Sequence, residues 1–156
     1  MLSDKASLKV CLILEQKGKV ILLEQTKNNG GRYALIGGKV ECEEFATQSL
    51  VRESFEEAGI VIQEQNLTLV HALHLHKGKK RQMILYFKTH YWEGEVMSCE
   101  PKKFKQATWF DIQNLPEELS KTTRSVLEHY YQGISFTRAT VETQIKIVEL
   151  ESECTA

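Results

Sequence analysis

The sequence predicts an α/β fold in which a mixed β-sheet packs against two helices. Apolar runs typical of strands occur before, between and after two helical segments, and hairpin-like turns replace a regular alternation of strand and helix. The length of 156 residues fits one domain with an ordinary core, since 42% of the residues are hydrophobic and 26% are charged. We therefore expect a single domain over residues 1–156.

The first half should begin with a hairpin and end in a helix. The turn-like sequence at 16–19 separates two apolar runs and should join them as antiparallel strands. A loop rich in glycine and asparagine at 26–32 should be flexible, and Gly59 should end the helix. The expected elements are strands at 8–14, 20–23 and 33–36 and a helix from about Glu43 to Ala58.

The second half should contain a longer hairpin and a second helix. A basic turn at 77–81 separates two strand-like runs, and an apolar stripe that includes Val126 and Leu127 follows helical spacing. The stretch 134–156 fits neither a helical nor a strand period, so the sequence predicts no structure for it. The expected elements are strands at 67–76, 82–92 and 107–110 and a helix at 121–132.

The charge balance and the cysteine spacing exclude several classes of protein. Twenty lysine and arginine residues against 21 aspartate and glutamate residues give a net charge of -1, so no stable binding to nucleic acid is expected. No apolar stretch approaches the length of a membrane span and no signal peptide is evident, which favours a cytoplasmic protein without membrane contact. The four cysteines lack metal-site spacing and are expected to be reduced thiols: Cys11, Cys42, Cys99 and Cys154.

Three histidines share one expected strand. His74 and His76 fall on one face of it and His71 on the other, because successive strand residues point to opposite sides of a sheet. No fourth ligand accompanies them. We expect a half-exposed sheet face here rather than a metal site.

Three glutamates gather on one side of the expected first helix. Glu53, Glu56 and Glu57 are neighbours on a helix, whereas the opposite side should pack into the core and carries Leu50, Val51, Ser54, Phe55 and Ala58. Like charges at this spacing repel unless a cation lies between them. Carboxylate oxygens suit Mg²⁺, with Mn²⁺ as a substitute, and Mg²⁺ commonly bridges carboxylates to substrate phosphates. The cluster points to phosphate chemistry, and a solvated helix face is the alternative.

A longer pattern contains this cluster. Gly38, then five residues, Glu44, then seven residues, leads to Arg52-Glu-Ser-Phe-Glu-Glu-Ala-Gly-Ile60, which resembles the Nudix hydrolase signature G-x5-E-x7-R-E-U-x-E-E-x-G-U, where U is aliphatic. Eight of its nine specified positions agree. Ser54 replaces the usual aliphatic residue, Glu43 a common glycine and Ile36 a common proline. The resemblance implies a Nudix-type α/β/α sandwich with a mixed β-sheet.

The resemblance also implies roles for the matching residues. Arg52 would orient the glutamates through its planar fork, and Glu44 would position Arg52. The implied catalytic residues are Glu53, Glu56, Glu57, Arg52 and Glu44. The implied metal ligands are the Gly37 carbonyl, Glu53, Glu56 and Glu57, with Glu95 or Glu100 on the loop after the second hairpin as further acidic candidates. Whether Glu56, Glu95 or Glu100 acts as the base stays open.

The implied reaction is Mg²⁺-dependent hydrolysis of a phosphoanhydride bond in a small nucleotide. The stretch 100–118 resembles MutT-like Nudix proteins, so the first candidate substrate is a nucleoside triphosphate, including an oxidised one such as 8-oxo-dGTP, cleaved to a nucleoside monophosphate and pyrophosphate. The alternatives are ADP-ribose, a nucleotide sugar or a dinucleoside polyphosphate as substrate, or a nucleotide-sensing module without catalysis. A monomer and a homodimer are both compatible with the sequence. The candidate substrate-binding residues are Gly38, Lys39, Arg32, Tyr33, Trp109 and Asp111.

Overall fold

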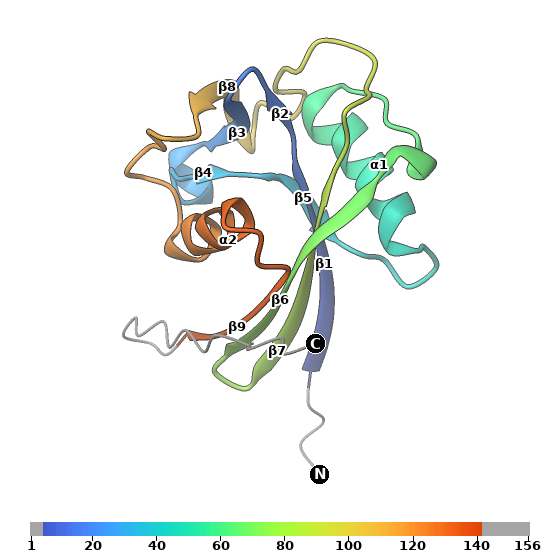
Figure 1. Cartoon of the computed structure of the whole chain (residues 1–156). Coiled ribbons are helices and arrows are strands. Elements are labelled where there is room, and N and C mark those ends of the chain that lie inside the picture. The colour runs from blue at the N-terminus through green and yellow to red at the C-terminus, as the bar shows by residue number, and fades with distance from the viewer. Residues whose placement is uncertain (1–4, 142–156) are drawn as a thin grey trace.

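A computed structural model describes residues 5–141 of the chain (Figure 1). In chain order the elements are β1 (Lys5–Ile13), β2 (Glu15–Gln16), β3 (Lys19–Gln25), the 3-10 helix η1 (Lys27–Asn29), β4 (Tyr33–Ala34), β5 (Ile36–Lys39), α1 (Ala46–Ala58), the 3-10 helix η2 (Glu64–Asn66), β6 (Thr68–Lys77), β7 (Lys80–Lys88), β8 (Phe104–Asp111), α2 (Lys121–Tyr131) and β9 (Phe136–Val141).

The strands form two sheets. The larger sheet has the order β5-β1-β7-β6-β9 and is mixed, because β1 runs antiparallel to β5 and parallel to β7. The smaller sheet pairs β3 with β2, β4 and β8, all antiparallel. Helices α1 and α2 lie on opposite sides of the strands (Figure 1). The predicted α/β fold with a mixed sheet is confirmed.

Both faces of the central strands are buried, each under a different helix. On β1, Val10 and Leu12 join a core cluster that contains Leu50 of α1. The alternate residue Ile13 joins a second cluster that contains Leu127 of α2. A strand covered on both faces reads as a continuous apolar run, which is what the sequence shows at 10–14. Each fully buried aliphatic side chain of this kind contributes about 1.5–3 kcal/mol.

The predicted first hairpin was wrong in its pairing. The chain turns at Lys17 and Gly18 as expected, but only the two-residue β2 pairs with β3 there, extended by a hydrogen bond from Ile21 N–H to the Leu14 carbonyl at 3.1 Å. Strand β1 instead pairs with β5 and β7 in the other sheet. The spacing of a turn predicts local pairing, but it does not reveal that distant strands fill both edges of β1.

Several boundaries differ from those expected. Helix α1 begins at Ala46 rather than near Glu43, because the Gln48 side chain accepts the Phe45 N–H at 2.9 Å and fixes the first turn there. The strand expected at 33–36 is split between the two sheets. Strand β7 ends at Lys88, whereas β8 is longer than expected. In the unassigned tail, β9 pairs in parallel with β6, and 142–156 lies outside the described residues.

The orientation of α1 also differs from the prediction. Ser54 and Glu57 are fully buried with Leu50, whereas Phe55, which was expected in the core, is 61% exposed. Positions i, i+4 and i+7 share one side of a helix, so Leu50, Ser54 and Glu57 face the sheet together. The placement of Phe55 in the core was therefore wrong, and one of the three glutamates belongs to the buried side.

Ser54 offers a direct test of this packing. Its hydroxyl group is buried, and within residues 5–141 it has no hydrogen-bond partner. An unpaired buried hydroxyl costs free energy that alanine does not incur. We expect Ser54→Ala to raise the free energy of unfolding by about 1 kcal/mol in chemical denaturation. A matched Ser125→Ala variant on α2 should not be stabilised, and destabilisation of Ser54→Ala would contradict the packing described.

The three histidines of β6 have different surroundings. His71 is buried, and its ring nitrogens contact the Ile134 carbonyl and the Thr137 hydroxyl, each at 2.8 Å. The rings of His74 and His76 meet edge to face at 4.9 Å. His71 thus ties β6 to the β9 segment, and the expectation of a half-exposed face holds only for the other two.

Cys11, Cys42 and Cys99 are free thiols, and Cys154 lies outside the described residues. Burial raises the pKa of the Cys11 thiol to about 11. Across the described part of the chain, no helix has the length and apolarity needed to span a membrane.

Candidate active site

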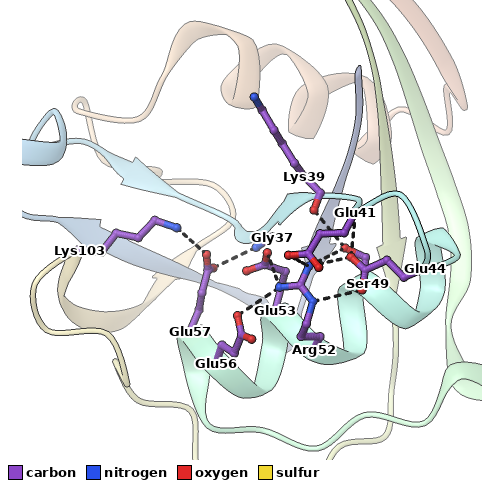
Figure 2. Close-up of polar contacts among 10 residues, drawn as sticks. All are labelled: Gly37, Lys39, Glu41, Glu44, Ser49, Arg52, Glu53, Glu56, Glu57 and Lys103. Carbon is purple, nitrogen blue, oxygen red and sulfur yellow. Dashed lines mark hydrogen bonds and ion pairs between the residues drawn. The ribbon is translucent and has the colours of Figure 1, made fainter. Parts of the chain in front are cut away.

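Glu53 and Glu57 of α1 lie against the Gly-Gly strand β5, which is an edge strand of the larger sheet (Figure 2). Strand β5 pairs with β1, with Gly37 opposite Cys11 and Gly38 opposite Val10. Helix α1 packs on β1 through Leu50 and reaches β5 with its glutamates. The turn at 40–45 between β5 and α1 completes the arrangement, so the whole signature from Gly38 to Ile60 surrounds one cluster of charged groups.

Glu57 is the most buried charged group of the cluster. Its side chain is 1% exposed, and its two oxygens have separate donors: Oε2 accepts the Gly37 N–H at 3.1 Å, and Oε1 contacts Lys103 Nζ at 3.1 Å (Figure 2). Burial raises the pKa of Glu57 to about 7, against the opposing effects of the Gly37 N–H and Lys103. A nearby cation therefore stabilises the charged form of this buried carboxylate.

Arg52 is the centre of a second set of contacts. Its Nε and Nη2 atoms donate to the two oxygens of Glu44 at 3.1 and 2.7 Å, which is a bidentate pair. Its Nη1 atom donates to Glu53 at 3.1 Å and to Glu56 at 3.2 Å. The hydrogen bonds from Arg52, followed by one from the Glu41 N–H, lower the pKa of Glu44 to about 2. Arg52 therefore links the turn before α1 to two carboxylates on the helix.

Gly38 allows Glu53 to approach the strand closely. A Cβ atom at this position would overlap the Glu53 carboxyl group, at 2.6 Å from its Cδ. The Glu53 side chain is only 13% exposed, and burial raises its pKa, opposed by Arg52. Glu56 is 47% exposed. The exposure of the three glutamate side chains therefore increases from Glu57 through Glu53 to Glu56.

The carboxylate oxygens of the cluster suit a hard divalent cation, but in the structure they pair with different protein cations. Carboxylate oxygens are the ligands that Mg²⁺ prefers, and the gap that Gly38 leaves is filled by a carboxylate. Within residues 5–141, however, no group of three or more histidine, cysteine or acidic residues is gathered around one point where a metal ion would lie. Glu53 and Glu56 are paired with Arg52, and Glu57 is paired with Lys103.

The loop 93–103 brings the two acidic loop candidates to different positions. Glu100 is half-buried, and its carbonyl accepts the N–H groups of Lys103 and Phe104, so it lies in the turn that carries Lys103. Its charge contributes to the raised pKa of Lys103. Glu95 is exposed. Of the two, Glu100 is the one that the fold associates with the cluster.

The candidate substrate-binding residues are spread over the fold. Lys39 is exposed on β5 opposite Lys9; its carbonyl accepts a hydrogen bond from Ser49, whereas its side chain extends away from the glutamates (Figure 2). Tyr33 packs on the α2 side, edge to face with Phe110 at 4.9 Å between ring centres, whereas Trp109 packs on the α1 side. The two rings therefore lie against different faces of the smaller sheet, and a single base cannot stack between them.

Arg32 and Asp111 lie further from the glutamates in the fold. Arg32 lines a cleft of about 440 Å³ on the α2 side, together with Lys77, Glu118 and Lys121. Asp111 is exposed at the end of β8, and its Oδ1 atom accepts the Gln113 N–H at 2.8 Å. Asp111 thus stabilises a turn, as its position before Pro116 also suggests.

Two residues of the cluster are absent from the sequence prediction. Lys103 contacts Glu57 from 46 positions away, and no local pattern marks it among the other lysines of its segment. Ser49 accepts from Arg52 and donates to the Lys39 carbonyl, both at 3.4 Å. Ser49 lies one turn before Glu53, so helical spacing from Arg52 is the signal by which it could have been found.

A mixed sheet between two helices, with an arginine and glutamate network held against a Gly-Gly strand, is the arrangement that the signature implies. The sequence matches the NUDIX domain over residues 6–130, and the chain belongs to the Nudix family. The resemblance of the Gly38 to Ile60 segment is thereby confirmed.

Individual relatives extend this assignment. The chain is 32% identical over 107 residues to an ADP-ribose pyrophosphatase from Methanocaldococcus jannaschii, covering 67% of this chain and 62% of that protein. It is 31% identical over 109 residues to an NAD-capped RNA hydrolase from Pectobacterium carotovorum, covering 69% of this chain and 40% of that protein. The chain therefore spans less than two thirds of these curated relatives.

A solved structure gives the same fold. The crystal structure of a MutT Nudix hydrolase from Burkholderia pseudomallei superposes with a TM-score of 0.71 at 25% identity, covering 80% of this chain and 97% of that chain.

Proposed function

We propose that this protein hydrolyses a phosphoanhydride bond in a free nucleoside triphosphate, using Mg²⁺ and releasing a nucleoside monophosphate and pyrophosphate. The observation that carries the proposal is the buried Glu57, held between the Gly37 N–H and a cation beside the Arg52 network. Burying a charged carboxylate is costly, and a metal-dependent reaction is a reason to keep one there. An oxidised or modified deoxynucleotide such as 8-oxo-dGTP is included in the substrate class.

Each charged residue of the cluster would have a distinct role in this reaction. Glu53, Glu56 and Glu57 would hold the metal, which supplies charge neutralisation on the phosphate oxygens. Arg52 keeps Glu53 and Glu56 at fixed positions, and Glu44 fixes Arg52 through the bidentate pair. The exposed side chain of Lys39 would turn toward a substrate phosphate and bind it. Catalysis would then depend on positioning and electrostatics, as phosphoryl transfer generally does.

A second candidate keeps the chemistry and changes the substrate. The names of two relatives, an ADP-ribose pyrophosphatase and an NAD-capped RNA hydrolase, favour a substrate in which a pyrophosphate bridges two larger groups. With ADP-ribose the products would be AMP and ribose 5-phosphate, without free pyrophosphate. The two candidates therefore differ in the products that they release.

The test is a substrate panel with product analysis. Nucleoside triphosphates, 8-oxo-dGTP, ADP-ribose, NAD, nucleotide sugars and dinucleoside polyphosphates are incubated with protein and Mg²⁺, and pyrophosphate, phosphate and nucleoside monophosphate are measured separately. We expect pyrophosphate from a nucleoside triphosphate. Turnover of ADP-ribose alone would replace the first candidate with the second. No turnover above a Glu57→Gln control would contradict both and favour a nucleotide-sensing module.

A further inference from the structure

Lys103, at the end of loop 93–103, contacts a glutamate of α1 through its side chain. Its Nζ atom lies 3.1 Å from Glu57 Oε1 and 5.1 Å from the centre of the Phe104 ring. The lysine side chain is 46% exposed, whereas the carboxylate that it contacts is 1% exposed. The ammonium therefore approaches the buried carboxylate from the open side, where an ion or a substrate would arrive from solvent.

The loop is built so that Lys103 reaches this position. Cys99 N–H donates to the main-chain carbonyl of Glu57 at 2.9 Å, and Met97 N–H donates to that of Ala58 at 3.2 Å. Lys103 N–H then closes a turn on the Glu100 carbonyl at 2.9 Å. The loop that carries the lysine is thus attached to the same residue whose carboxylate the lysine pairs with, which fixes the contact better than an isolated surface lysine would.

We propose that Lys103 is the counter-cation of Glu57 in the metal-free protein, and that it leaves Glu57 Oε1 when a divalent metal ion binds there. The inference rests on the proposed function, because it takes Glu57 to be a metal ligand. In the structure, two protein cations balance the charge of the three glutamates: Arg52 and Lys103.

The two cations are not equivalent in this exchange. Arg52 donates four hydrogen bonds to carboxylates, two of them to Glu44, and also pairs with Glu41 at 3.8 Å, so its displacement would break a network. Within residues 5–141, Lys103 forms one ion pair, and its side chain is 46% exposed. A lysine ammonium is a mobile point charge, and a unit charge of like sign beside a cation site weakens metal binding. The metal therefore competes with Lys103, and the lysine sets the metal concentration that the protein needs.

The test measures metal binding without substrate. Mn²⁺ binding to the wild type and to each variant is followed by electron paramagnetic resonance at the same pH and ionic strength. Lys103→Met should bind Mn²⁺ about fivefold or more tightly than the wild type, and Lys103→Arg, which retains the charge, should not. Lys105→Met is the matched control, because Lys105 is 49% exposed and pairs with Glu24 at 3.7 Å.

A second measurement requires no neutral variant. In the wild-type protein, the Nζ resonance of Lys103, assigned by its absence from Lys103→Arg, should shift when Mg²⁺ is added, and that of Lys105 should not. This result decides the matter if Lys103→Met fails to fold.

The outcomes separate this inference from the proposed function. If the wild type binds Mn²⁺ and Glu57→Gln does not, while Lys103→Met binds no more tightly than Lys105→Met and the Lys103 resonance is unmoved, the exchange is overturned and the proposed function stands. If the wild type binds no Mn²⁺ at all, both are overturned.

Discussion

A Glu57→Gln variant should lose hydrolysis of the preferred substrate by about a thousandfold while remaining folded. Glutamine keeps the shape of the side chain, and its carbonyl oxygen can still accept the Gly37 N–H. It removes the charge on which metal binding depends. Lys103 would lose its partner, but its half-exposed ammonium remains in contact with water. We therefore expect a free energy of unfolding within about 1 kcal/mol of the wild type.

The measurement is kcat at saturating Mg²⁺, together with Mn²⁺ binding and chemical denaturation. Glu128→Gln, an exposed glutamate on α2, is the matched control and should retain activity. A Glu57→Gln variant with more than about a tenth of the wild-type kcat would show that the buried carboxylate is not a metal ligand, whatever its burial suggests.

Alanine substitution of the two adjacent glycines of β5 should affect different properties: stability at Gly37 and activity at Gly38. At Gly37 a Cβ atom would lie 2.9 Å from the Cys11 Cα atom and overlap the Val10 carbonyl oxygen, both main-chain atoms of β1. At Gly38 it would overlap only the end of the Glu53 side chain. A strand backbone cannot give way cheaply, whereas a carboxylate can turn aside.

Gly37→Ala should therefore lower the free energy of unfolding by about 3 kcal/mol or more, whereas Gly38→Ala should cost less than about 1 kcal/mol. Gly38→Ala should instead reduce kcat by about a hundredfold, because a displaced Glu53 no longer has the correct position. Denaturation curves and steady-state kinetics on both variants measure this. Equal destabilisation by the two substitutions would contradict the close approach of Glu53 to β5.

The sequence could predict the residue types of the site because its signature lies within one turn and one helix. From Gly38 to Ile60 the spacing is local, and helical geometry alone brings Glu53, Glu56 and Arg52 together. The orientation of that helix was harder to predict. Phe55 is apolar but exposed, and Glu57 is charged but buried. The polarity of the side chains therefore predicted the wrong buried face of α1.

By itself, the sequence determined the family, the fold class and the charged residues of the motif, since periodicity and motif spacing act over a few turns of chain. Only the tertiary structure decided what those groups contact. The pairing of Glu57 with Lys103, the fit of Glu53 against Gly38 and the partners of β1 all join segments that are distant in the chain. Such contacts depend on how layers pack around two cores, which no local pattern specifies.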